Sequence, residues 1–119
     1  VAHYGSSVKA SDFRRKTGNQ QDSANNALAT AVHWQIIRSL ADKKKGPGIL
    51  IPDRGIRRAR FNVLTGVKHP AILVEGGFMS HPEESRHIHK ATYQSTMAKA
   101  VCNAIYFYRV NTNPKTKKR

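Results

Sequence analysis

The sequence predicts an α/β fold in which a short sheet is combined with two main helices and basic extended termini. A short apolar run rich in β-branched residues, 71–74, lies between Pro70 and the pair Gly76-Gly77, which is the pattern of a strand covered on both faces. Two longer segments, 24–40 and 93–108, repeat their apolar residues at helical spacing. A chain of 119 residues fits one domain.

The first of these elements is the helix that follows the N-terminal segment. Residues 1–17 show no hydrophobic period, so we expect an extended basic arm there. Asp22 or Ser23 can cap the helix that follows, and Gly46-Pro47-Gly48 breaks it. Its apolar face is predicted to comprise Ala24, Leu28, Val32, Ile36 and Leu40, widened by Trp34 and Ile37.

The elements after this helix are shorter until the last one. Residues 49–51 form either a short strand or a hydrophobic linker, and the segment 61–64 is predicted to be a strand. Ser80 and Glu83 have the spacing of a capping box that opens a helix. The last helix carries one apolar stripe beside which we expect Cys102 to be a buried thiol; the stripe comprises Tyr93, Met97, Ala100, Val101, Ala104, Ile105 and Tyr108.

Glu75 is the candidate catalytic residue, because it ends the apolar run and precedes two glycines that allow a sharp turn. A carboxylate at the C-terminal end of such a strand lies where open α/β sheets place their chemistry. The structural alternative is that Glu75 caps a loop or pairs with a nearby arginine.

Several spaced motifs resemble one enzyme family. The segment from Pro70 to Glu84 resembles the Pro-Ala-x-Leu-Val-Glu-x-Gly-Phe-x-Ser-Asn-x-x-Glu signature of zinc-dependent N-acetylmuramoyl-L-alanine amidases of the amidase_3 type. The resemblance extends upstream through the segments 53–64 and 18–29 and downstream through the last helix. It implies a partial amidase-like three-layer fold over residues 18–110, of which only the C-terminal half is present, followed by a basic tail at 111–119.

The resemblance also assigns roles to residues. It implies that Glu75 is the general base, and that zinc is held by two histidines and a glutamate of the N-terminal half, which would lie before residue 1. Catalytic zinc needs three protein ligands and an open position, and no pair of the six histidines has the i, i+4 spacing of a helical zinc site. We therefore expect no metal site and no cofactor in this chain, with zinc bound only if the missing half is supplied, and Glu75 to be vestigial.

The net charge of +14, from 21 Lys and Arg against seven Asp and Glu, favours a polyanionic partner. The basic residues occur in four clusters, which make RNA phosphate a better interpretation than a solvated face. The RNA-binding candidates are Lys9, Arg14, Arg15, Lys16, Lys43, Lys44, Lys45, Arg57, Arg58, Lys115, Lys117, Lys118 and Arg119.

Two functions compete at this point. The first is a non-catalytic, amidase-derived structural protein of a large ribonucleoprotein, a mitochondrial ribosome, with RNA bound by the basic arms and neighbouring proteins covering an exposed sheet edge. The second is the C-terminal part of an active zinc-dependent amidase of the bacterial periplasm or cell wall. The absent ligands and the added charge favour the first, whereas the intact Glu75 segment favours the second. No apolar run approaches the length of a membrane span.

Overall fold

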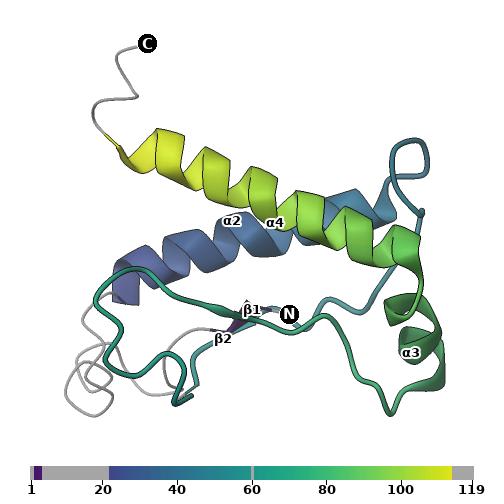
Figure 1. The fold of residues 1–119 in the computed structure, drawn as a ribbon, viewed down its shortest axis with the longest axis horizontal. Coiled ribbons are helices and arrows are strands. Elements are labelled where there is room, and N and C mark those ends of the chain that lie inside the picture. Colours follow the sequence, from purple (N-terminus) through teal and green to yellow (C-terminus); the bar gives the residue numbers. More distant parts are fainter. Residues whose placement is uncertain (1, 4–21, 60, 114–119) are drawn as a thin grey trace. The chain divides into compact units, whose positions relative to one another are not determined.

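The computed structural model describes residues 2–3, 22–59 and 61–113 of the chain. The described elements are β1 (Ala2–His3), α2 (Asp22–Ala41), β2 (Ile56–Arg57), β3 (Leu73–Val74), α3 (Pro82–Ile88) and α4 (Ala91–Thr112), drawn in Figure 1. They confirm a partial α/β fold. None of the described helices is long and apolar enough to cross a membrane.

The chain divides into two units, and α2 passes from the first into the second. The first unit comprises Val1–Thr30 and Arg54–Glu75, and therefore holds all the described strands. The second comprises Ala31–Asp53 and Gly76–Arg119, and holds the remainder of α2 together with α3 and α4.

The sheet of the first unit has the strand order β2-β1-β3. β1 is parallel to β2, with Ala2 opposite Ile56, and antiparallel to β3, with Ala2 opposite Val74. The sequence predicts an extended arm at 1–17, but Ala2–His3 form the central strand of this sheet, and residues 4–17 lie outside the described residues. The expected partner at an exposed sheet edge stays a prediction; β2 and β3 are the edges of the described sheet.

The first turns of α2 hold the chain at β2 and just before β3. Ala29 is fully buried, and its small side chain lets Ile56 and Ile72 pack against the helix. Asn25 is also fully buried, and its Oδ1 accepts a hydrogen bond from the Ala71 N–H at 2.8 Å. The Asp22 carboxylate accepts hydrogen bonds from Nε and one terminal nitrogen of Arg58, at 3.1 and 3.2 Å. Asp22, Asn25 and Ala29 lie on one face of the helix. Together they hold the backbone before β3 and the residue after β2.

The predicted apolar face of α2 is largely confirmed, since Val32, Ile36 and Leu40 are buried. Trp34 does not widen this face, because its side chain is 51% exposed. The helix ends at Ala41, before the predicted glycine break, because the Asp42 carboxylate accepts hydrogen bonds from the N–H groups of Lys44 and Lys45 and closes a turn there. These two bonds also lower the pKa of Asp42.

Of the two outcomes expected for residues 49–51, the structure shows the linker, in which Leu50 is 88% exposed. The strand predicted at 61–64 is absent from the described residues. The segment 61–64 is a turn, because the N–H groups of Leu64 and Thr65 both donate to the Phe61 carbonyl. β3 covers only Leu73–Val74 and is half-buried, so the expected strand covered on both faces is wrong in extent and burial.

The last helix begins and ends close to the predicted limits. α4 buries Tyr93, Ala100 and Ala104 of the expected stripe, whereas Ile105 is half-exposed. Cys102 is exposed, so the expectation of a buried thiol is wrong. Position 102 lies one residue beyond Val101 and two short of Ala104, which places it to the side of the buried stripe.

Replacing Asn25 by Ala is expected to lower the free energy of unfolding by about 1–3 kcal/mol, because the Ala71 N–H loses its acceptor inside the protein. Urea denaturation of the purified protein measures this change. Asn26→Ala is the matched control, since Asn26 is exposed on the same helix and its substitution is expected to cost less than about 0.5 kcal/mol. Equal losses for the two variants would contradict the assigned role of Asn25.

Candidate functional site

The candidate site is centred on Glu75, which directly follows β3 and is exposed. The hydrogen bond between Ala71 and Asn25 fixes the chain four residues earlier. Since side chains alternate along a strand, fixing the start of this segment also fixes the face on which each following side chain emerges. An exposed carboxylate at a strand end can accept a proton from a neighbouring water or substrate group.

A side chain at either of the two glycines after Glu75 would crowd a neighbouring side chain within the second unit. A Cβ on Gly76 would lie 3.1 Å from Cε of Met97, and a Cβ on Gly77 would lie 3.1 Å from Cδ1 of Ile88. Gly77 also has φ of 143°, a backbone conformation that residues with a side chain rarely adopt. The sequence predicts a sharp turn here, and the structure adds that the backbone approaches α3 and α4 closely.

Tyr93 holds this glycine segment from α4. Its side chain is almost fully buried, and its hydroxyl donates to the Gly76 carbonyl at 2.7 Å. Burial raises the pKa of Tyr93 above its ordinary value of 10.0, and the carboxylate of Glu84 adds to the effect. The phenol therefore stays a hydrogen-bond donor over the whole neutral range.

The loop after the glycines ends at a histidine cap. α3 begins at Pro82, and Nδ1 of His81 accepts a hydrogen bond from the Glu84 N–H at 3.3 Å. The predicted capping box of Ser80 and Glu83 is therefore wrong by one residue. Pro82 explains the shift, because proline is favoured at the first helical position and makes the residue before it extended. His81 takes the place that asparagine has in the signature, and here its side chain caps α3.

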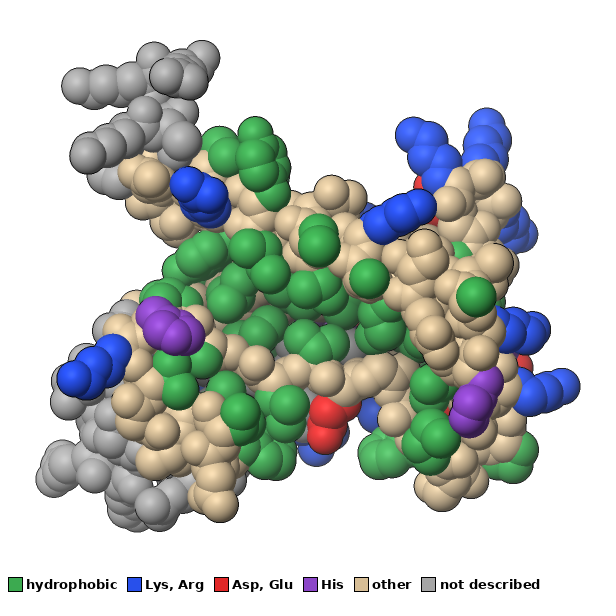
Figure 2. Space-filling model, in the orientation of Figure 1, with side chains coloured by type: hydrophobic (Ala, Val, Ile, Leu, Met, Phe, Trp, Pro, Cys, Tyr) green, Lys and Arg blue, Asp and Glu red, His purple; other side chains and the backbone are tan. Residues whose placement is uncertain are grey.

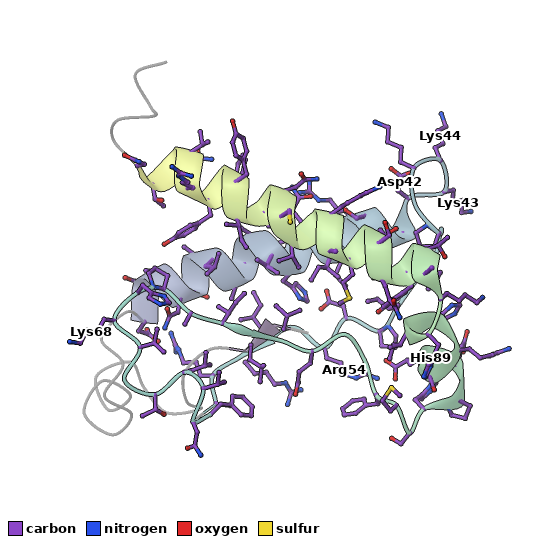
Figure 3. The ribbon with its side chains drawn as sticks, viewed as in Figure 1. Asp42, Lys43, Lys44, Arg54, Lys68 and His89 are labelled. Carbon is purple, nitrogen blue, oxygen red and sulfur yellow. The ribbon has the colours of Figure 1, made fainter. Side chains whose placement is uncertain are left out.

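The predicted basic residues fall into three groups. Arg57 is exposed in β2, while Arg58 is held by Asp22 in a bidentate ion pair. Lys43, Lys44 and Lys45 lie in the turn after α2, where Figure 3 labels the first two. The others lie outside the described residues, and these are Lys9, Arg14, Arg15, Lys16, Lys115, Lys117, Lys118 and Arg119.

The described residues do not bring together three or more His, Cys, Asp or Glu side chains that could hold a metal ion. His33 is buried in α2, and its Nε2 lies 2.8 Å from Oδ1 of Asp53. His33 thus holds the residue that directly precedes Arg54-Gly55. His69 and His89 are exposed, and each has its Nδ1 within hydrogen-bonding distance of a backbone carbonyl oxygen. The described residues therefore do not form a zinc site.

Sequence reasoning missed three supporting residues: Asn25, His33 and Tyr93. Asn25 and His33 had a detectable signal, because both lie at helical spacing from the buried positions Ala29 and Ile36, and a polar residue there needs a partner. Tyr93 had none, since the partner of its hydroxyl is a backbone carbonyl far away in sequence.

Comparison with known proteins gives a consistent result. Residues 3–106 match the family model described as N-acetylmuramoyl-L-alanine amidase. The "Putative N-acetylmuramoyl-L-alanine amidase YrvJ" of Bacillus subtilis is 30% identical over 81 residues, which cover 68% of this chain and 14% of that protein. The "Probable cell wall amidase LytH" of Staphylococcus aureus is 30% identical over 93 residues, which cover 71% of this chain and 31% of that protein. No solved structure matches the chain.

These matches overturn the ribosomal interpretation. The chain is similar to bacterial cell-wall amidases across most of its described length, and the expected structural role in a mitochondrial ribosome is wrong. The matches support the cell wall, which was the alternative location, and the RNA partner stays a prediction. Overall charge misled because it does not identify a partner, and at least one candidate, Arg58, is engaged by an internal carboxylate.

The raised pKa of Tyr93 predicts a specific loss of stability at alkaline pH. Tyr93→Phe is expected to cost about 0.5–1.5 kcal/mol at pH 8, because the hydrogen bond to Gly76 is lost. Above a pH of about 10 the unfolded chain ionises this tyrosine first and binds fewer protons than the folded chain. The advantage of the wild type over the variant therefore shrinks as pH rises through the raised pKa.

Urea denaturation of the wild type and of Tyr93→Phe between pH 8 and 11 measures this difference. The two proteins have the same lysines, so the effect of lysine titration on stability cancels in the comparison. Tyr106→Phe is the control for removing a tyrosine hydroxyl from α4, since Tyr106 is 71% exposed. A difference between Tyr93→Phe and the wild type that does not change with pH would contradict the burial of the Tyr93 phenol.

Proposed function

Because the chain belongs to the N-acetylmuramoyl-L-alanine amidase family, we propose that it is part of a peptidoglycan hydrolase that cleaves the amide bond between N-acetylmuramic acid and L-alanine. Glu75 is the proposed general base. The proposal also assigns the enzyme to the bacterial cell wall, in line with the name of the relative from Staphylococcus aureus. The chain spans 14–31% of the length of these two relatives, so the activity of the whole protein is part of the proposal.

The observation that carries the proposal is the support built around Glu75. Glu75 is exposed, and within the first unit the segment that leads to it is held by the buried side chain of Asn25. The glycine segment that follows belongs to the second unit, in which Tyr93 holds it. A base must be held in position near the proton that it removes, because a small displacement of a reacting group lowers the rate strongly.

The proposed reaction is hydrolysis assisted by this carboxylate. Glu75 takes a proton from a water molecule as the water oxygen attacks the carbonyl carbon of the lactyl group. The C–N bond then breaks, and the proton passes from Glu75 to the departing nitrogen. The products are a free carboxylate on the muramic acid and a peptide whose N-terminal L-alanine has a free amine.

The zinc that the family resemblance implies does not fit the described residues, which group no three possible ligands. We therefore assign no step of the reaction to a metal. The resemblance also implies a three-layer fold. The described strands form one small sheet, so the three-layer fold of the whole enzyme is part of this proposal.

Glu75→Gln is expected to lower the rate of peptide release at least about 100-fold, because the amide keeps the shape of the side chain and cannot take the proton. The measurement is mass spectrometry of muropeptides incubated with the full-length protein, following the appearance of peptides that begin with a free L-alanine amine.

Glu83→Gln is the matched control, since Glu83 is an exposed carboxylate eight residues later. This substitution is expected to leave the rate within about twofold of the wild-type rate. Wild-type rates in the Glu75→Gln variant would show that Glu75 is not the base. No release by the wild-type protein would indicate a non-catalytic member of the family.

A further inference from the structure

The second unit contains a pocket of about 750 Å³ that the amidase proposal does not use. Its walls are the turn after α2 and the first turns of α4, with one residue from α3. Glu75 is not among its lining residues. Its volume falls within the usual range of small-molecule sites.

Four lysines line this pocket. Lys44 and Lys45 come from the turn, whereas Lys90 and Lys99 come from the start and the middle of α4. No Asp or Glu is among the described residues that line it. Asp42 precedes the two turn lysines; its carboxylate accepts their N–H groups and also interacts with the Lys45 charge, so it offsets part of the positive charge of the turn without lining the pocket. Figure 2 shows Lys and Arg side chains gathered at this turn.

Uncharged hydrogen-bond donors line the pocket together with the four lysines. Thr92, Ser95 and Thr96 contribute hydroxyl groups to the lining. His87 also lines the pocket, and its Nδ1 is buried without a hydrogen-bond partner. The adjoining first turn of α4 has no acidic residue and its cap makes no side-chain hydrogen bond, so the positive end of this long helix is not neutralised by its own residues.

We propose that this pocket binds a phosphate group. Several lysines brought together from different elements attract a multivalent anion, and hydroxyl groups beside them supply directed donors to its oxygens. A phosphate offers more charge and more acceptor oxygens than a carboxylate, which would leave most of the lysines without a counter-charge. The ligand is either a small phosphate monoester, which carries up to two negative charges, or a phosphodiester polymer, in which each unit carries one charge and neighbouring units together match the four lysines.

The test is isothermal titration of the full-length protein with inorganic phosphate, and with sodium acetate at the same pH and ionic strength. The wild-type protein is expected to bind phosphate at least about tenfold more tightly than acetate. Lys44→Glu and Lys99→Glu are each expected to weaken phosphate binding about tenfold or more, because each reverses a charge inside the pocket.

Lys43→Glu is the matched control, because it makes the same charge change in the same turn at a residue that does not line the pocket. It is expected to change the affinity for phosphate less than about threefold, because Lys43 does not line the pocket and its exposed charge is screened by solvent. Circular dichroism checks that all three variants keep their helices. Equal weakening by Lys43→Glu and Lys44→Glu would overturn the proposal, as would acetate binding as tight as phosphate binding.

A second titration identifies the source of the phosphate. Tighter binding of poly(glycerol phosphate) than of glycerol 3-phosphate, per phosphate group, assigns the site to a phosphodiester polymer, and the reverse assigns it to a small ester. Both results require the same sensitivity to Lys44→Glu. Binding of single-stranded RNA without any binding of inorganic phosphate would overturn the proposal.

Discussion

The hydrogen bond from the Ala71 N–H to the buried side chain of Asn25 is the constraint on which the candidate site depends. It joins a helix to a strand segment 46 residues later and sets where that segment begins. β3 contains only two residues, so the ladder to β1 supplies few bonds of its own. Without the Asn25 anchor, a slip of one residue would turn the Glu75 side chain to the opposite face. Asp22 and Ala29 hold the neighbouring segment on the same helix face, so one side of α2 organises the residues after Arg54-Gly55 and those before the Glu75 loop.

The helices were predictable from the sequence, whereas the sheet was not. Apolar spacing found α2 and α4 because each buries a continuous stripe, such as Val32, Ile36 and Leu40, whose period records the fold directly. The strands are only two residues long, which is too short for an alternating pattern, so the turn at 61–66 was mistaken for a strand and Ala2–His3 for part of an arm. Burial of single residues at the edge of a helical stripe also escaped prediction, as the exposed Trp34 and Cys102 show.

The candidate site was predictable in its central residue but not in its supports. Glu75 stands at the junction of an apolar run and two glycines, and this local pattern is visible in the sequence. Its supports are long-range contacts between a side chain and a backbone group, for which the sequence contains no local pattern. The net charge had the opposite fault: it was easily seen, yet it did not distinguish Arg58, which stabilises the fold through Asp22, from Lys44, which lines a pocket.

The close packing around Gly77 bears on how this protein can vary in nature. Every single-nucleotide change that replaces a glycine codon with that of another amino acid introduces a Cβ atom. At Gly77 that atom meets Ile88 and forces the backbone out of its φ of 143°. The genetic code thus offers this position no small step, since any replacement strains the backbone and requires the end of the Ile88 side chain to shift by a few tenths of an ångström. Lineages that lose the glycine are therefore expected to carry further changes in the same loop.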